Sequence, residues 1–73
     1  MSKLPRLSGK EIIKALSKAD FQVTRQGRHG AVLRHSDGRR TVVPTSHPEV
    51  DRGTLQAIIT QAGLTREEFM KLL

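Results

Sequence analysis

The part of this chain that most constrains its fold is the stretch over residues 27–44. It contains two glycine-containing turn signals, at 27–30 and 36–38, and an apolar run follows each of them. Turn signals that separate short apolar runs are typical of antiparallel strands. The stretch therefore predicts a hairpin with strands over about 31–35 and 40–43, the second of which is closed by Pro44.

Further patterns on both sides of the hairpin predict helices and one more strand. Ser8 with Glu11 matches a capping box at the start of an amphipathic helix, and the same pattern recurs near the end of the chain. Residues after the first helix alternate apolar and polar, as in a half-buried strand. The elements expected around the hairpin are a helix from Ser8 to Asp20, a strand at 21–26, a loop at 45–52, a helix at 53–62 stopped by Gly63, and a short helix after Thr65.

The order of these elements indicates an α+β fold. It reads α-β-β-β-α plus a short C-terminal helix, which is the order of a double-stranded-RNA-binding domain. The chain has too few apolar residues to cover both sides of a sheet, so the helices are expected on one face of a three-stranded antiparallel sheet. Seventy-three residues without an internal boundary predict a single domain over 1–73.

The distribution of charge favours a polyanionic partner. The chain has 13 Lys and Arg against 7 Asp and Glu, and the excess lies in the first helix and the hairpin. A basic face of this kind suits phosphate binding, although it can also be only a solvated surface. The residues predicted to contact RNA are Arg25, Gly27, Arg28, Arg34, Arg39 and Arg40, with Lys10 and Lys14 as further candidates.

Composition argues against several other classes of protein. The chain has no cysteine, and no apolar run approaches the roughly 18 residues of a membrane-spanning helix. We therefore expect a cytoplasmic protein without a membrane segment. His29 and His35 lie about 20 Å apart if the intervening residues form one strand, so they cannot share a metal ion. No metal and no cofactor are expected.

One histidine remains as the candidate for catalysis. An imidazole that titrates near neutral pH can take the proton of an RNA 2′-hydroxyl, while arginines stabilise the charge on the attacked phosphate. His29 fits this role best, because glycines flank its turn and Arg25 and Arg28 are neighbours. The flanking Gly27 and Gly30 are expected to supply backbone angles that other residues resist. The alternative is a turn histidine without a role. His35 and His47 are expected to be structural or exposed.

The competing hypothesis is a non-catalytic double-stranded-RNA-binding module that holds RNA without cutting it. The two phenylalanines fall at core-like positions, so the chain offers no aromatic platform of the kind that single-strand binders use. Cleavage of single strands favours the nuclease, and retention of intact duplex favours the binding module.

The chain resembles the HicA family of mRNA-cleaving toxins over about residues 7–64. The segments that carry the resemblance are Gly27-Arg28-His29, His35-Ser36-Asp37-Gly38-Arg39, Val43-Pro44, Gly53-Thr54-Leu55, Ile58-Ile59 and Gln61-Ala62-Gly63-Leu64. The resemblance implies a fold like the double-stranded-RNA-binding domain, His29 as the catalytic residue of an endoribonuclease, and a HicB-type antitoxin that covers the active surface. Arg28 stands where the family often has serine.

Overall fold

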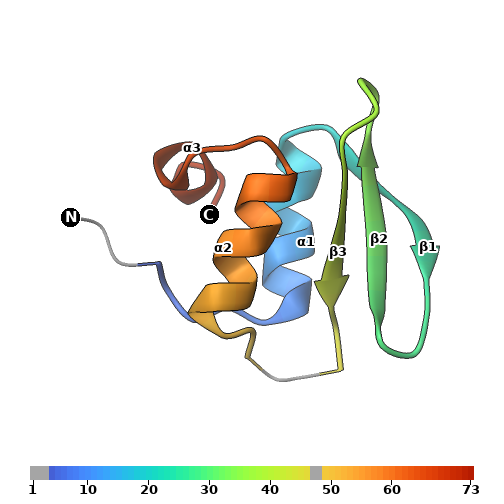
Figure 1. The fold of residues 1–73 in the computed structure, drawn as a ribbon, viewed down its shortest axis with the longest axis horizontal. Helices are drawn as coiled ribbons and strands as arrows, with labels where there is room; N and C mark the ends of the chain where they lie inside the picture. The colour runs from blue at the N-terminus through green and yellow to red at the C-terminus, as the bar shows by residue number, and fades with distance from the viewer. Residues whose placement is uncertain (1–3, 47–48) are drawn as a thin grey trace.

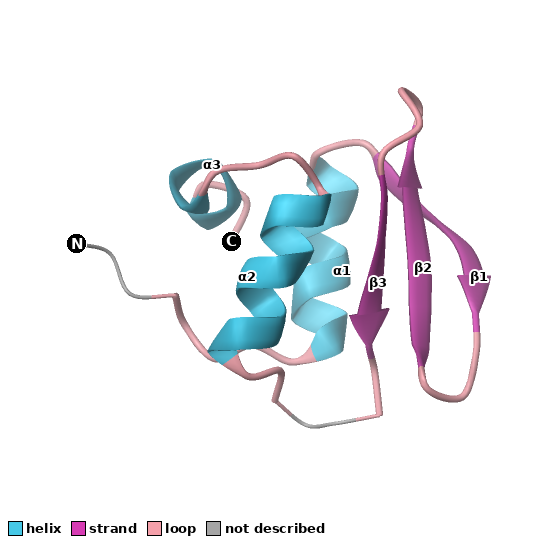
Figure 2. Ribbon diagram, in the orientation of Figure 1, coloured by secondary structure: helices cyan, strands magenta, loops and turns pink. Residues whose placement is uncertain are grey.

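The computed structural model describes residues 4–46 and 49–73. Its elements follow the predicted order of helix, three strands, helix and short helix (Figures 1 and 2). Among the described residues, no helix is both long enough and apolar enough to cross a membrane. The elements are α1 at Gly9–Lys18, β1 at Phe21–Gln26, β2 at Gly30–His35, β3 at Arg40–Pro44, α2 at Arg52–Gln61 and α3 at Arg66–Met70.

Each helix begins at a side chain that caps its first N–H groups. Ser8 caps α1 and Thr65 caps α3, each in the predicted capping box with the glutamate three residues later. α2 begins one residue earlier than predicted, because the carboxylate of Asp51 accepts from the backbone N–H of Thr54 and acts as its cap. The same contacts, led by the Thr54 hydroxyl, lower the pKa of Asp51. α1 ends before Asp20, which has a left-handed φ of 68°.

The three strands form one antiparallel sheet in the order β1-β2-β3. α1 packs against β1 and β3, and α2 packs against β3. Figure 1 shows both helices on the same side of the sheet, which confirms the predicted layering. We call the opposite side the open face. Its residues are Gln22 and Arg25 of β1, Gly30, Val32 and Arg34 of β2, and Arg40, Val42 and Pro44 of β3.

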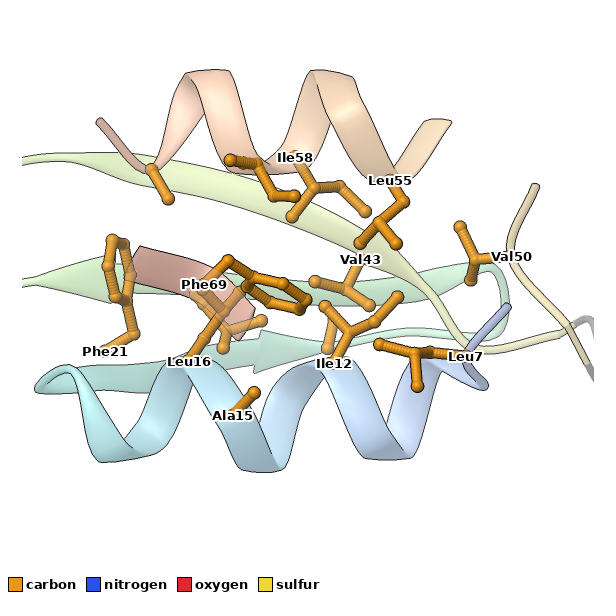
Figure 3. Close-up of a cluster of buried hydrophobic side chains, with 14 of the residues drawn as sticks. Leu7, Ile12, Ala15, Leu16, Phe21, Val43, Val50, Leu55, Ile58 and Phe69 are labelled. Atoms are coloured by element: carbon orange, nitrogen blue, oxygen red, sulfur yellow. The ribbon is translucent and has the colours of Figure 1, made fainter. Parts of the chain in front are cut away.

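The core lies between the sheet and the three helices (Figure 3). Its largest side chain from the C-terminal region is Phe69 of α3, which is fully buried beside Leu16 of α1 and Ile58 of α2. Burial of each such side chain contributes about 1.5–3 kcal/mol. Thr41 of β3 is the buried polar residue of the described chain, and its hydroxyl donates to Oε1 of Gln61 at 2.9 Å. The core therefore uses the helix-facing side of every strand.

Glycine serves the turns differently from what the sequence suggested. Gly27 and Gly30 were expected to supply unusual backbone angles, but neither has a positive φ. The positive values belong to Gly38, at 102°, and to Gly63, at 72°, which ends α2 as predicted. Gly30 is instead required by space, because a Cβ there would lie 2.7 Å from the carbonyl oxygen of Val43.

Replacing Gly9 with alanine is expected to destabilise the domain by about 1–2 kcal/mol. A Cβ on Gly9 would overlap the carbonyl oxygen of Pro44 and lie 3.1 Å from Cα of Thr45, so α1 must move away from the end of β3. Overpacking of this kind costs about 1–3 kcal/mol, which exceeds the gain of up to about 1 kcal/mol from alanine's helix propensity. Urea unfolding measures the difference.

The matched control is Gly53→Ala in the first turn of α2. A Cβ there meets only the carboxylate of Asp51, at 3.2 Å, and that side chain can move. We expect this variant to stay within about 0.5 kcal/mol of the parent, or to gain stability. Equal stability of the two variants would contradict the close contact between α1 and β3.

Candidate functional site

The turn between β1 and β2 places the catalytic candidate at the surface. The backbone N–H of Gly27 donates to the carbonyl oxygen of Gly30 at 2.8 Å, which closes the turn. Arg28 and His29 lie at its tip, and both are exposed. No hydrogen bond or ion pair joins the imidazole of His29 to any other residue that the structure describes. The ring is therefore accessible to a bound phosphate chain.

A β-bulge decides the direction of Arg25. Val23 pairs with Leu33, but Arg25 pairs with Val32, so Thr24 is an extra residue in β1. Its hydroxyl donates to the carbonyl oxygen of Val32 at 3.3 Å. Side chains alternate along a strand, so without the bulge Arg25 would share the core-facing side of Val23. The bulge moves the guanidinium to the open face.

Three of the predicted RNA-binding arginines come together on the open face. Arg34 pairs with Arg40 across β2 and β3, and Arg25 lies one row nearer to the His29 turn. All three are exposed, and none forms an ion pair with a described residue. Two valines share the row of Arg25: the half-buried Val32, and Val42 with 53% of its surface exposed. The open face thus combines cations with a small apolar centre.

Arg39 is separated from these arginines although it neighbours Arg40 in the chain. Its Nε donates to Oδ2 of Asp37 at 2.8 Å, and its Nη1 donates to the carbonyl oxygen of Ala62 at 2.6 Å. The guanidinium carbon also lies 5.5 Å from the centroid of the Phe21 ring. Arg39 therefore joins the β2–β3 turn to the end of α2, and we do not include it among the proposed phosphate ligands.

The carboxylate that holds Arg39 is itself organised by the turn. The backbone N–H of Arg39 donates to Oδ1 of Asp37 at 3.0 Å and is the main reason that the pKa of Asp37 is lowered. The guanidinium of Arg39 lowers this pKa further. The Asp37 carboxylate is thus satisfied within its own turn.

The two lysine candidates lie away from the open face. Lys10 and Lys14 belong to α1, which covers the other side of the sheet, and both are exposed. Gly27, the remaining predicted contact, lies in the His29 turn. The predicted RNA-binding residues therefore do not form one surface. Some lie in the His29 turn, some on the open face and two on the helical side, while Arg39 forms structural contacts.

His35 lies at the far end of the sheet from His29 and has a structural environment. Its ring packs edge-on against Phe21, with centroids 5.2 Å apart, and only 16% of its side chain is exposed. Nδ1 lies 3.1 Å from both the backbone nitrogen and Oδ1 of Asp37, contacts that need opposite protonation of that atom. The backbone contact is the consistent one, because Arg39 already binds the carboxylate. His35 thus closes the β2–β3 turn.

A hollow of about 490 Å³ also lies at the His35 end, and its lining includes Ser17, Gln22 and Arg34. It does not include His29, so this hollow and the catalytic candidate are at opposite ends of the sheet. The described part of the chain contains no cluster of three His, Cys, Asp or Glu side chains that could hold a metal ion. His47 lies outside the described residues.

Sequence reasoning identified the arginines of the open face but missed the residues that arrange them. The Thr24 bulge has no sequence signal beyond the break in alternation at Arg25. Gln22, Val32 and Val42 share the face with the arginines, and the period of two along each strand could have shown this.

Comparison with protein families connects this geometry to a known group. A family described as HicA toxin of bacterial toxin-antitoxin matches residues 9–64. The matched region begins in α1, includes the whole sheet and the His29 turn, and ends just after α2. No curated protein is significantly similar to the chain.

Proposed function

Since the chain belongs to the HicA family of toxins from bacterial toxin–antitoxin systems, we propose that it is an endoribonuclease that cuts mRNA and that His29 is its catalytic residue. The observation that carries this proposal is the exposed imidazole at the tip of the β1–β2 turn, next to Arg28 and without a bond to another described residue. A structural histidine is normally packed or hydrogen-bonded, as His35 is here.

The reaction needs the His29 imidazole, neighbouring arginines, water and the 2′-hydroxyl of the substrate. The imidazole of His29 takes the proton from an RNA 2′-hydroxyl, and the 2′-oxygen forms a bond to the adjacent phosphorus. The bond from phosphorus to the 5′-oxygen breaks, and that oxygen receives a proton from water, which reaches the exposed turn. Arg28 and Arg25 stabilise the negative charge on the phosphate oxygens in the transition state. The products are a 2′,3′-cyclic phosphate and a 5′-hydroxyl.

The same proposal includes a protein partner. A toxin of a toxin–antitoxin system is held inactive by its antitoxin, and we propose a HicB-type protein for this chain. The basic excess of the chain, with a net charge of +6, favours an acidic surface on that partner.

The competing reading is an RNA-binding module without catalysis, which the fold alone would also suit. At the start of α2 the exposed residues are Asp51, Arg52 and Gly53, so this helix offers one cation to a duplex. This single cation favours the nuclease over the duplex-binding module.

The nuclease is expected to cut single-stranded RNA at full rate in the presence of EDTA and to leave 2′,3′-cyclic phosphate ends. The reason is that the RNA 2′-hydroxyl is the nucleophile, so no metal-bound water is required. Mass spectrometry of the fragments, with and without EDTA, measures both properties. Loss of cleavage in EDTA, or fragments with 5′-phosphate ends, would contradict the proposed mechanism. RNA that is bound but never cut would favour the binding module.

A further inference from the structure

We infer that the open face holds an extended single strand of RNA and leads it to the His29 turn. This inference rests on the proposed function and adds the form of the substrate and its path over the protein. The observations behind it are the arrangement of the open-face residues in rows, the unbalanced charge of the first row, and the small or apolar residues between that row and His29.

The open-face residues form three rows across the sheet. The first row is Gln22, Arg34 and Arg40, the second is Arg25, Val32 and Val42, and the third is Gly30 and Pro44. Neighbouring rows are two residues apart along β2 and β3, which is about 7 Å. The first row therefore lies about 13 Å from the third, and the His29 turn follows directly. A strand of RNA that runs along β2 passes all three rows before it reaches the imidazole.

The first row contains two positive charges that no described residue neutralises. Arg34 and Arg40 are direct cross-strand partners, and like charges in such positions are destabilising. Neither guanidinium has an ion-pair partner among the residues described. A phosphate bound between them removes this repulsion. The pair is therefore suited to anchor the backbone of a polyanion.

The second and third rows suit a strand that lies flat on the sheet. Val32 and Val42 are apolar side chains on which a ribose or base can rest, and Arg25 at the edge of the sheet can contact a phosphate. Gly30, without a side chain, adds nothing in height next to the turn. An acidic polypeptide could also use the cations, but rows leading to the exposed histidine favour RNA.

The chemistry at His29 requires the strand to be single. Attack by a 2′-oxygen on its own phosphate needs the 2′-oxygen, the phosphorus and the leaving 5′-oxygen in line. A regular duplex holds its sugar–phosphate backbone in a form that prevents this alignment. A single strand that is extended over the open face is free to rotate into this alignment. The open face thus selects the conformation that the turn can cut.

The test measures binding of a single-stranded decanucleotide whose 2′-hydroxyls are methylated, so that it cannot be cut. In the double variant Arg34→Ala, Arg40→Ala we expect at least tenfold weaker binding by fluorescence anisotropy. The slope of log affinity against log salt should fall by about 1.4, because two phosphate contacts are lost. The melting temperature should stay equal or rise, because the variant also removes the cross-strand repulsion.

The matched control is the double variant Lys10→Ala, Lys14→Ala, which removes the same charge from α1 on the other side of the sheet. We expect less than threefold weaker binding. An equal loss in both variants would overturn the inference, because binding would then follow net charge alone. Tighter binding of a blunt RNA duplex than of the single strand would also overturn it. If the arginine variant lost affinity only for poly-L-glutamate, the face would belong to an acidic protein and the RNA path would be wrong.

A comparison of a short and a long substrate tests the RNA path independently of the catalytic step. A dinucleotide can occupy the His29 turn but cannot reach the first row. The arginine double variant should therefore cut the dinucleotide as the parent does, and cut an unmodified decanucleotide at least tenfold less efficiently in kcat/KM. Equal effects on both substrates would reject the path while leaving the nuclease intact. If the parent cut neither substrate, the nuclease would fail, and the binding measurements would still decide the path.

Discussion

The variant His29→Ala is expected to lose at least a hundredfold in the rate of RNA cleavage, and to lose growth inhibition when it is expressed in a bacterial host. Removal of a general acid–base group typically costs 10²–10⁴-fold in rate. The side chain is exposed and makes no hydrogen bond or ion pair with another described residue, so the free energy of unfolding should change by less than about 0.5 kcal/mol. Cleavage of a labelled RNA and urea unfolding of the same preparation measure the two quantities.

Two further variants separate catalysis from structure. Ser36→Ala changes an exposed residue in the turn at the other end of the sheet and should retain full cleavage and toxicity. His35→Ala removes a ring that packs against Phe21 and should lower stability, but the rate per folded molecule should be unchanged. Full cleavage by His29→Ala, or a loss of activity in His35→Ala that exceeds its loss of folded protein, would assign the chemistry to a different histidine.

The fold could be predicted from the sequence because its signals are local. The capping boxes at Ser8 and Thr65, the alternation along 21–26 and the apolar periods of both long helices each depend on residues close together in the chain. The start of α2 was misplaced by one residue, because a single aspartate before a helix is a weaker signal than a capping box. The prediction of an unusual backbone angle at Gly27 was wrong. Glycine occurs in turns either for its positive φ or for its lack of a Cβ, and the sequence does not distinguish the two.

The arrangement of the arginines could be predicted only in part. Arg34 and Arg40 follow the period of two along their strands, so their common face is implicit in the sequence. Arg25 does not follow it, because the bulge at Thr24 depends on how two strands pair and not on either strand alone. Arg39 and Arg40 look equivalent as a doublet. The contacts of Arg39 with Asp37, with Phe21 and with the carbonyl group of Ala62 separate them, and Ala62 lies 23 residues further along the chain.

Because Arg39 makes contacts that Arg40 lacks, we expect its loss to have a large effect on stability. Arg39→Ala should lower the free energy of unfolding by about 2 kcal/mol. The change removes hydrogen bonds from the guanidinium to Asp37 and to the carbonyl oxygen of Ala62, and it removes the contact with Phe21. A hydrogen bond that involves a charged group contributes about 1.5–3 kcal/mol, and a cation at the C-terminal end of α2 also interacts favourably with the helix dipole. The backbone bond of residue 39 to Asp37 survives, which limits the loss.

Arg40→Ala is the matched control for this prediction, because it removes the same side chain one residue away. Arg40 is exposed on the open face opposite Arg34, so its loss should leave stability within about 0.5 kcal/mol or raise it slightly. Arg39→Lys should fall between Arg39→Ala and the parent, since an ammonium group cannot reproduce the fork that reaches two acceptors at once. Urea unfolding of the three variants at one pH gives the comparison. If Arg39→Ala proved no less stable than Arg40→Ala, the bond to the end of α2 would not hold in solution, and Arg39 would return to the candidates for RNA contact.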